Sequence, residues 1–131
     1  KCESVVQRLD RPNGLAFSLD EKQLYVSDSH NNNMWRFDVD SGGNVGAGAV
    51  FATCTDGCFD GFRLDNAGRI WSSAGDGVHC FSPDGTLLGK IKVPQTVANL
   101  TFGGPKKNRL FITATKSLYS VYVAATGAQT P

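Results

Sequence analysis

The chain has 131 residues, which is enough for one domain with a substantial core and too few for two ordinary domains. Its formal net charge of +1 gives no reason to expect a nucleic acid or an anionic membrane as a partner. No apolar run approaches the roughly 18 residues of a membrane-spanning helix, so no membrane association is expected.

The first residue and the cysteines bear on the origin of the chain. The chain does not begin with methionine and shows no signal sequence, so we expect a piece of a longer chain or a processed one. Cys2, Cys54, Cys58 and Cys80 lack the paired spacing of a zinc site. Free thiols are expected, with a Cys54–Cys58 disulfide as the alternative. The compartment is unknown, although reduced cysteines slightly favour the cytoplasm.

The composition indicates an all-β protein. Fifteen glycines, many of them in turn dipeptides, accompany abundant Val, Phe, Tyr and Ile. No stretch has convincing helical periodicity. We expect a first strand from Cys2 to Leu9. Alternation of apolar and polar residues then predicts four more, near residues 12–18, 23–28, 34–39 and 49–52.

This order of strands and turns recurs along the chain. Phe59–Leu64 corresponds to Pro12–Phe17, and Arg69–Ser72 corresponds to Gln23–Val26. A third copy opens at Ala98. A repeat of roughly 40–50 residues with four short strands per unit is typical of β-propeller blades.

The predicted fold class is therefore an all-β propeller with about three four-stranded blades, the third supplying three strands. We expect residues 1–131 to form a single partial propeller domain, with repeats near 10–53, 56–94 and 96–124. Closed propellers usually have about four to eight blades, so more chain or a second copy must cover the open faces. An immunoglobulin-like sandwich is the alternative, but it does not explain the repeat.

Three polar residues occupy equivalent places in the repeats. Asn13, Asp60 and Asn99 each stand where the innermost strand of a blade begins, and innermost strands line the channel of a propeller. Two amides and one carboxylate directed at one axis would supply hard oxygen ligands, which suit Ca²⁺, Mg²⁺ or Mn²⁺. The alternative is that Asn and Asp simply favour the turns that precede strands.

Several motifs in a fixed order make the chain similar to the gluconolactonase family, which includes senescence marker protein and the luciferin-regenerating enzymes. The resemblance covers essentially the whole chain and aligns it with the C-terminal half of the family. The motifs are Arg11–Ser18, Leu24–Ser29, Trp35–Asp40, Asp56–Gly61, Gly77–Phe81, Asn99–Gly104 and Leu110–Ala114.

The resemblance implies a six-bladed propeller that holds a divalent cation in its channel and hydrolyses lactones, typically sugar lactones. It makes Asn13 and Asp60 metal ligands, Asp60 also the catalytic base, and Asn99 a residue behind the ligands or against the substrate. Ca²⁺ is the ion expected first, with Zn²⁺, Mn²⁺ or Mg²⁺ as alternatives. Family members usually have proline where this chain has Phe59, which alters the corner but keeps the carboxylate.

Other residues carry weaker expectations. His30 lies in the polar loop Asp28–Asn33, which would rim the channel mouth and place the imidazole near a substrate, or would simply be solvated. His79 is expected to be structural. Trp35 and Trp71 are expected to pack between blades.

The family's remaining ligand, a Glu, and its substrate-binding Arg and Asn belong to the half that this chain does not align with. We therefore expect metal-dependent lactone hydrolysis in which the chain supplies part of the active site. The alternative is a catalytically inactive half-propeller that acts as a binding or assembly module. Expected partners are a lactone and either the absent N-terminal half or a second copy in a homodimer.

Overall fold

The computed structural model describes residues 1–128, which form eleven strands and no helix. Blade 1 contains β1 (Pro12–Phe17), β2 (Gln23–Asp28), β3 (Asn33–Val39) and β4 (Val45–Thr53). Blade 2 contains β5 (Phe62–Leu64), β6 (Ile70–Ala74), β7 (Gly77–Phe81) and β8 (Leu87–Lys92). Blade 3 contains β9 (Val97–Gly103), β10 (Arg109–Ala114) and β11 (Ser117–Tyr122). The all-β prediction is confirmed.

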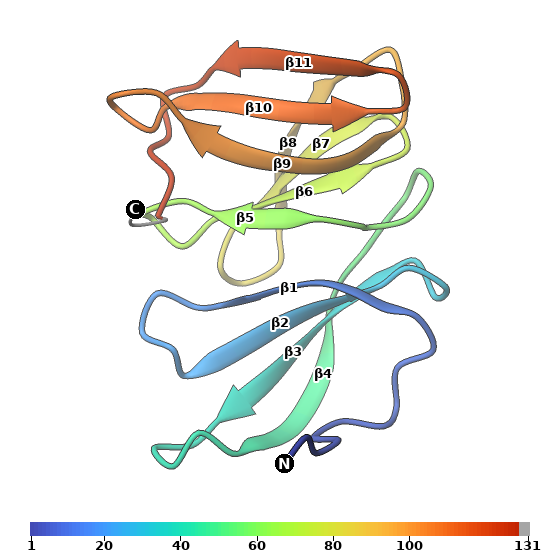
Figure 1. Cartoon of the computed structure of the whole chain (residues 1–131), viewed down its shortest axis with the longest axis vertical. Helices are drawn as coiled ribbons and strands as arrows, with labels where there is room; N and C mark the ends of the chain where they lie inside the picture. Colours follow the sequence, from blue (N-terminus) through green and yellow to red (C-terminus); the bar gives the residue numbers. More distant parts are fainter. Residues whose placement is uncertain (129–131) are drawn as a thin grey trace.

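Each blade is an antiparallel sheet in which strands that follow one another in sequence lie side by side. Figure 1 shows the blades stacked along the long axis of the molecule, with β1, β5 and β9 one above another. These three are the first strands of their sheets, so the residues that enter them meet along one side. Since residues 1–128 form no helix, they contain no helical membrane span.

The blades pack face to face around two apolar cores. Between blades 1 and 2, fully buried side chains include Met34, Phe59, Phe62 and Ile70. Every residue of β6 and β7 is buried, because both strands lie inside blade 2 with a blade on each face. Burial on both faces also encloses three polar residues of these strands, Ser72, Ser73 and His79.

Trp71 on β6 belongs to the second core and packs against blade 3. Its ring meets that of Phe102 edge to face, with 5.9 Å between centroids. Its Nε1 donates a 2.9 Å hydrogen bond to the fully buried carboxylate of Asp65, which also accepts from Arg69 Nε at 2.6 Å. The prediction that Trp71 packs between blades is confirmed.

The N-terminal segment differs from the prediction. Residues 1–11 pair with no strand, so the strand expected from Cys2 to Leu9 is wrong. Val6 and Leu9 pack instead on the outer face of blade 1, against Leu24 and Phe37. Val6 and Leu9 are the partly buried residues of this segment, which crosses the face of a sheet and has no neighbouring strand with which to hydrogen-bond.

Trp35 lies on this same outer face. Its ring stacks on that of Phe37 at 5.9 Å, and the Arg8 guanidinium lies 5.9 Å from its centroid. Within the described residues Trp35 therefore contacts Phe37 and the N-terminal segment, and its packing between blades stays a prediction.

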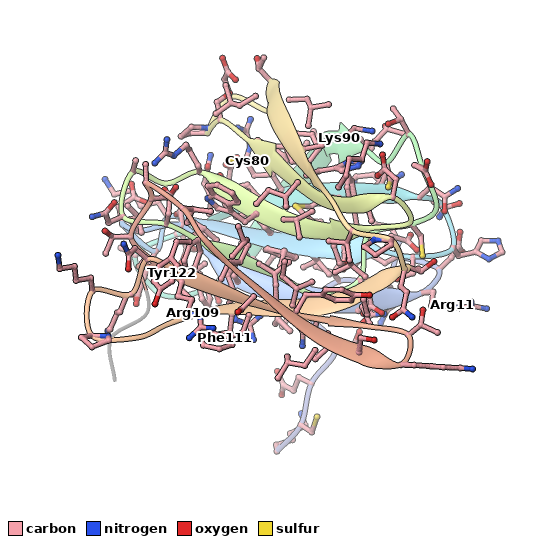
Figure 2. The ribbon with its side chains drawn as sticks, turned by 90° about the horizontal axis from the view of Figure 1, so that it is seen from above. Arg11, Cys80, Lys90, Arg109, Phe111 and Tyr122 are labelled. Atoms are coloured by element: carbon pink, nitrogen blue, oxygen red, sulfur yellow. The ribbon has the colours of Figure 1, made fainter. Side chains whose placement is uncertain are left out.

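The outer face of blade 3 presents a cation between two aromatic rings. The Arg109 guanidinium carbon lies 5.0 Å from the Phe111 centroid and 5.3 Å from the Tyr122 centroid. Figure 2 shows these three side chains together, on the opposite side of the molecule from Arg11. This face and the outer face of blade 1 are the two ends of the stack.

All four cysteines are free, as expected, so the Cys54–Cys58 disulfide does not form. Cys54 and Cys80 are buried, and burial raises the pKa of the Cys80 thiol to about 11. A raised pKa disfavours the reactive thiolate, so Cys80 acts as a small core residue.

Asp28 at the end of β2 hydrogen-bonds the segment that leads into β1. Its fully buried carboxylate accepts hydrogen bonds from the backbone N–H groups of Asp10 (3.0 Å) and Arg11 (2.9 Å) and from Asn31 Nδ2 (2.9 Å). Burial alone would raise the pKa of Asp28, but these hydrogen bonds outweigh it and lower the pKa to about 2.

We predict that Asp28→Asn lowers the unfolding free energy at neutral pH by about 1–3 kcal/mol, because one buried N–H loses its acceptor. The folded pKa lies below the ordinary value of 3.8, so the carboxylate's contribution is present at neutral pH and is lost as pH falls from about 4 towards about 2. Urea denaturation of both proteins should therefore show the difference shrinking across that window.

Asp38→Asn, on the exposed side of β3, is the matched control and should change stability by less than about 0.5 kcal/mol. A wild-type advantage over Asp28→Asn that stays constant down to the acid end of the window would contradict the assignment.

Candidate functional site

Asn13 is the second residue of β1, and its side chain is exposed. Its Nδ2 atom donates a 3.2 Å hydrogen bond to Ser29 Oγ, just beyond the end of β2. Pro12 opposite Asp28 and Leu15 opposite Val26 bracket an irregularity in the pairing of β1 with β2. Asn13 therefore lies where the ladder is interrupted, and its side chain is free to project beyond the sheet.

Asp60 comes two residues before β5 and is half-buried. Burial raises the pKa of its carboxyl group, and a hydrogen bond with the Asn13 side chain partly opposes this increase. The two predicted ligands, 47 positions apart in the sequence, thus have their side chains in contact.

Two buried serines hold the backbone of Asp60 on both sides. Its N–H donates to Ser73 Oγ at 2.9 Å, and its carbonyl oxygen accepts from Ser27 Oγ at 2.8 Å. Ser27 also accepts from the Gly14 N–H at 2.8 Å, so one hydroxyl joins the inner segments of blades 1 and 2. Both serines are fully buried, and these hydrogen bonds are therefore protected from water.

Glycines allow neighbouring inner strands to touch. A Cβ atom at Gly14 would lie 2.3 Å from the Asp60 carbonyl oxygen, and a Cβ atom at Gly61 would lie 2.1 Å from Asn99 Oδ1. Asn99, the third predicted residue, therefore lies directly against the glycine that follows Asp60. These contacts bring Asn13, Asp60 and Asn99 into one arc. The arc crosses β1, β5 and β9, which lie one above another in Figure 1.

His30 is exposed in the turn between β2 and β3. No contact among the described residues joins its imidazole to Asn13, Asp60 or Asn99. His79 is buried as expected, with Nε2 2.6 Å from Asp76 Oδ1. The structure thus groups three of the four predicted site residues and leaves His30 at the surface.

Sequence reasoning missed the hydroxyl groups behind the site. Ser27, Ser73 and Thr113 occupy the same place in the second strand of each blade, and Thr113 Oγ1 donates to the Asn99 carbonyl oxygen at 3.2 Å. Their recurrence at one repeat position was the available signal.

The donor atoms at this arc are a carboxylate and amide oxygens. Among residues 1–128 no group of three or more His, Cys, Asp or Glu side chains is placed to hold a metal ion. One half-buried carboxylate beside an amide matches part of the six to eight oxygen ligands that a cation such as Ca²⁺ takes, roughly. The arc contains no thiolate or imidazole group, which are the ligands that softer metal ions prefer.

The fold and the arc define a class of protein, namely β-propellers with polar oxygen donors at the starts of their inner strands. The family described as SMP-30/Gluconolactonase/LRE-like region matches residues 1–116. The chain belongs to this family. The propeller fold class and the resemblance predicted from the motifs are both confirmed.

Individual relatives agree with this assignment. Gluconolactonase from Zymomonas mobilis is 36% identical over 92% of this chain and 37% of its own length. The structure of a gluconolactonase from Xanthomonas campestris is 42% identical with a TM-score of 0.83, covering 89% of this chain and 39% of that one. Regucalcin from Agrobacterium tumefaciens, a calcium-binding protein, is 29% identical with a TM-score of 0.76, covering 86% and 40%. The chain thus spans about two-fifths of the length of these relatives.

We predict that Gly14→Ala destabilises the chain by about 1–3 kcal/mol, because the added methyl group meets the Asp60 carbonyl oxygen, a backbone atom that cannot rotate away. Gly89→Ala on β8 is the matched control, since a Cβ atom there meets nothing within 4 Å. Urea denaturation should show the loss for Gly14→Ala and a change within about 0.5 kcal/mol for Gly89→Ala. Equal effects would show that the close approach is unimportant.

Proposed function

We propose that this chain supplies part of the active site of a metal-dependent hydrolase acting on sugar lactones. The observation that carries the proposal is that hydrogen bonds bring Asn13 and Asp60 together from two blades. Ser29 Oγ joins Asn13 Nδ2 to the carbonyl oxygen of Phe59, the residue before Asp60, and Ser27 Oγ joins Gly14 to the Asp60 carbonyl oxygen. Gluconolactonases among the relatives support the substrate class. The regucalcin relative supports a divalent cation.

Asn13 and Asp60 would hold the cation, Ca²⁺ in the first place, with Zn²⁺, Mn²⁺ or Mg²⁺ as alternatives. A bound ion of this kind polarises a lactone carbonyl and lowers the pKa of coordinated water. The half-buried carboxylate of Asp60 suits this role, since a cation would offset the burial that raises its pKa.

Asp60 would also act as the general base. Its carboxylate would lie beside the water that attacks the lactone carbonyl, so it can take a proton from that water. The ring C–O bond then breaks, and the proton held by Asp60 passes to the leaving ring oxygen, which yields the hydroxy acid. Hydrogen bonds from Ser27 and to Ser73 keep the Asp60 backbone in place during proton transfer.

Asn99 and His30 would contact the substrate. The Asn99 side chain lies against Gly61, next to the base, where its amide could bind a lactone hydroxyl group. His30, exposed in the β2–β3 turn, would contact substrate at the rim of the channel. The remaining ligands would come from the N-terminal half of the propeller, or from a second copy that together with residues 1–131 closes the ring.

A second candidate function is a binding or assembly module without catalysis. The observation that favours it is the exposure of large apolar side chains at the ends of the stack. Leu15 on blade 1 is 64% exposed, and Leu118 and Tyr122 on blade 3 are 69% and 70% exposed. Exposed apolar side chains on these end faces are suited to packing against further blades.

We predict that the purified chain binds Ca²⁺ in calorimetry and that Asp60→Asn or Asn13→Ala weakens binding at least about tenfold, since the first removes the negative charge of a ligand and the second removes a ligand. Titrations with Mn²⁺, Zn²⁺ and Mg²⁺ would rank the ions. Asp38→Asn, outside the arc, should bind as the wild type does.

Hydrolysis of a sugar lactone, followed by acid release, tests the enzymatic part. Asp60→Asn should lower the rate by about 10²-fold or more relative to the same preparation with wild-type Asp60. Absence of both cation binding and hydrolysis in a dimer that closes the ring would reject the first proposal and leave the assembly module, whereas their absence in a monomer would show that the site needs the absent half. Light scattering then distinguishes a monomer from a self-assembled dimer.

A further inference from the structure

Ser29 is the first residue after β2 and is half-buried. Its hydroxyl group makes two contacts that lead to different blades. Ser29 Oγ donates to the Phe59 carbonyl oxygen at 2.8 Å and accepts from Asn13 Nδ2 at 3.2 Å. Its own N–H donates to the Arg11 carbonyl oxygen at 3.0 Å, which fixes its backbone beside the entry to β1.

The two contacts have different requirements. A serine hydroxyl has one proton, and Ser29 gives it to the carbonyl of Phe59. Only its lone pairs then remain for Asn13, and only the amide nitrogen of Asn13 can donate to them. Ser29, together with the Asp60 carboxyl group that also accepts from the Asn13 side chain, sets the orientation of the Asn13 amide, and the Oδ1 atom is left as a ligand for a cation.

We propose that Ser29 is a positioning residue, which sets the orientation of Asn13 and couples it to the loop that carries Asp60. The inference rests on the proposed function where cation binding is concerned. The link is short, because Phe59 immediately precedes Asp60. A displacement of this loop reaches Asn13 through one side chain.

Ser27 has a different role, although it lies two residues away. It contacts only backbone atoms, the N–H and carbonyl of Gly14 and the carbonyl of Asp60. Ser27 therefore holds strands together, whereas Ser29 touches a side chain of the site. Loss of the Ser29 hydroxyl should therefore change the behaviour of the Asn13 side chain directly.

The first measurement is solvent exchange of the Asn13 side-chain NH₂ group in the ¹⁵N-labelled chain, without any metal. We expect Ser29→Ala to accelerate this exchange about three- to tenfold, because one hydrogen bond is lost. Ser29→Thr keeps the hydroxyl and should restore the wild-type rate. The control Ser82→Ala removes a hydroxyl that contacts Asp84 in the β7–β8 turn and should leave Asn13 unchanged.

The second measurement is Ca²⁺ affinity by calorimetry on the same four proteins. Loss of a residue that orients a metal ligand commonly weakens binding by about 10–100-fold, so Ser29→Ala should fall in that range and Ser29→Thr should stay near wild type. Should Ser29→Ala fail to fold, Ser29→Cys keeps a side chain of similar shape with a much weaker donor and takes its place.

The two measurements separate the inference from the proposed function. If the wild type binds no Ca²⁺, the metal proposal fails, and exchange at Asn13 still decides whether Ser29 orients the amide. Unchanged exchange in Ser29→Ala would overturn the positioning role. So would faster exchange in Ser82→Ala of the same size, since the effect would then reflect general loosening.

Discussion

The arrangement of this chain depends on the contact between neighbouring inner strands. β1, β5 and β9 approach so closely that Gly14 has no room for a methyl group beside the Asp60 carbonyl, and Gly61 has none beside Asn99. A wider spacing would separate the side chains that enter these strands. The steric constraint at two glycines therefore creates both the packing of the blades and the arc of polar residues, and neither can change without the other.

The backbone around Asp60 makes few hydrogen bonds within the sheet of blade 2, because β5 has only three residues and begins at Phe62. The missing partners come from other blades: Gly61 N–H donates to the Ala98 carbonyl oxygen, and Asp60 bonds Ser27 and Ser73. An unsatisfied buried group would cost about 1–3 kcal/mol. The hydrogen bonds across blades hold the backbone of this loop in place, and a carboxylate with a fixed orientation requires such support.

Much of the fold could be predicted because alternation and the repeat carry the information that sheets require. The expected strand near residues 23–28 is β2, and Asn13, Asp60 and Asn99 are grouped as the repeat indicated. Apolar residues alone do not show whether a neighbouring strand is available, which is why the N-terminal segment, with Val6 and Leu9 packed on blade 1, does not form the expected strand. Ser29 could not be predicted, since its role depends on a contact between segments 16 and 30 positions away.

Phe59 shows how the corner before Asp60 is held without the proline that the family resemblance leads one to expect. Its fully buried ring meets Phe81 edge to face at 5.6 Å and His79 at 6.3 Å. His79 is itself held by Asp76, whose pKa burial would raise but hydrogen bonds from Lys92, His79 and Lys90 lower. A proline restricts a corner through its own φ angle, whereas Phe59 does so through the core between blades 1 and 2. The orientation of Asp60 is therefore coupled to packing between blades, and a change in that core would reach the site through one residue.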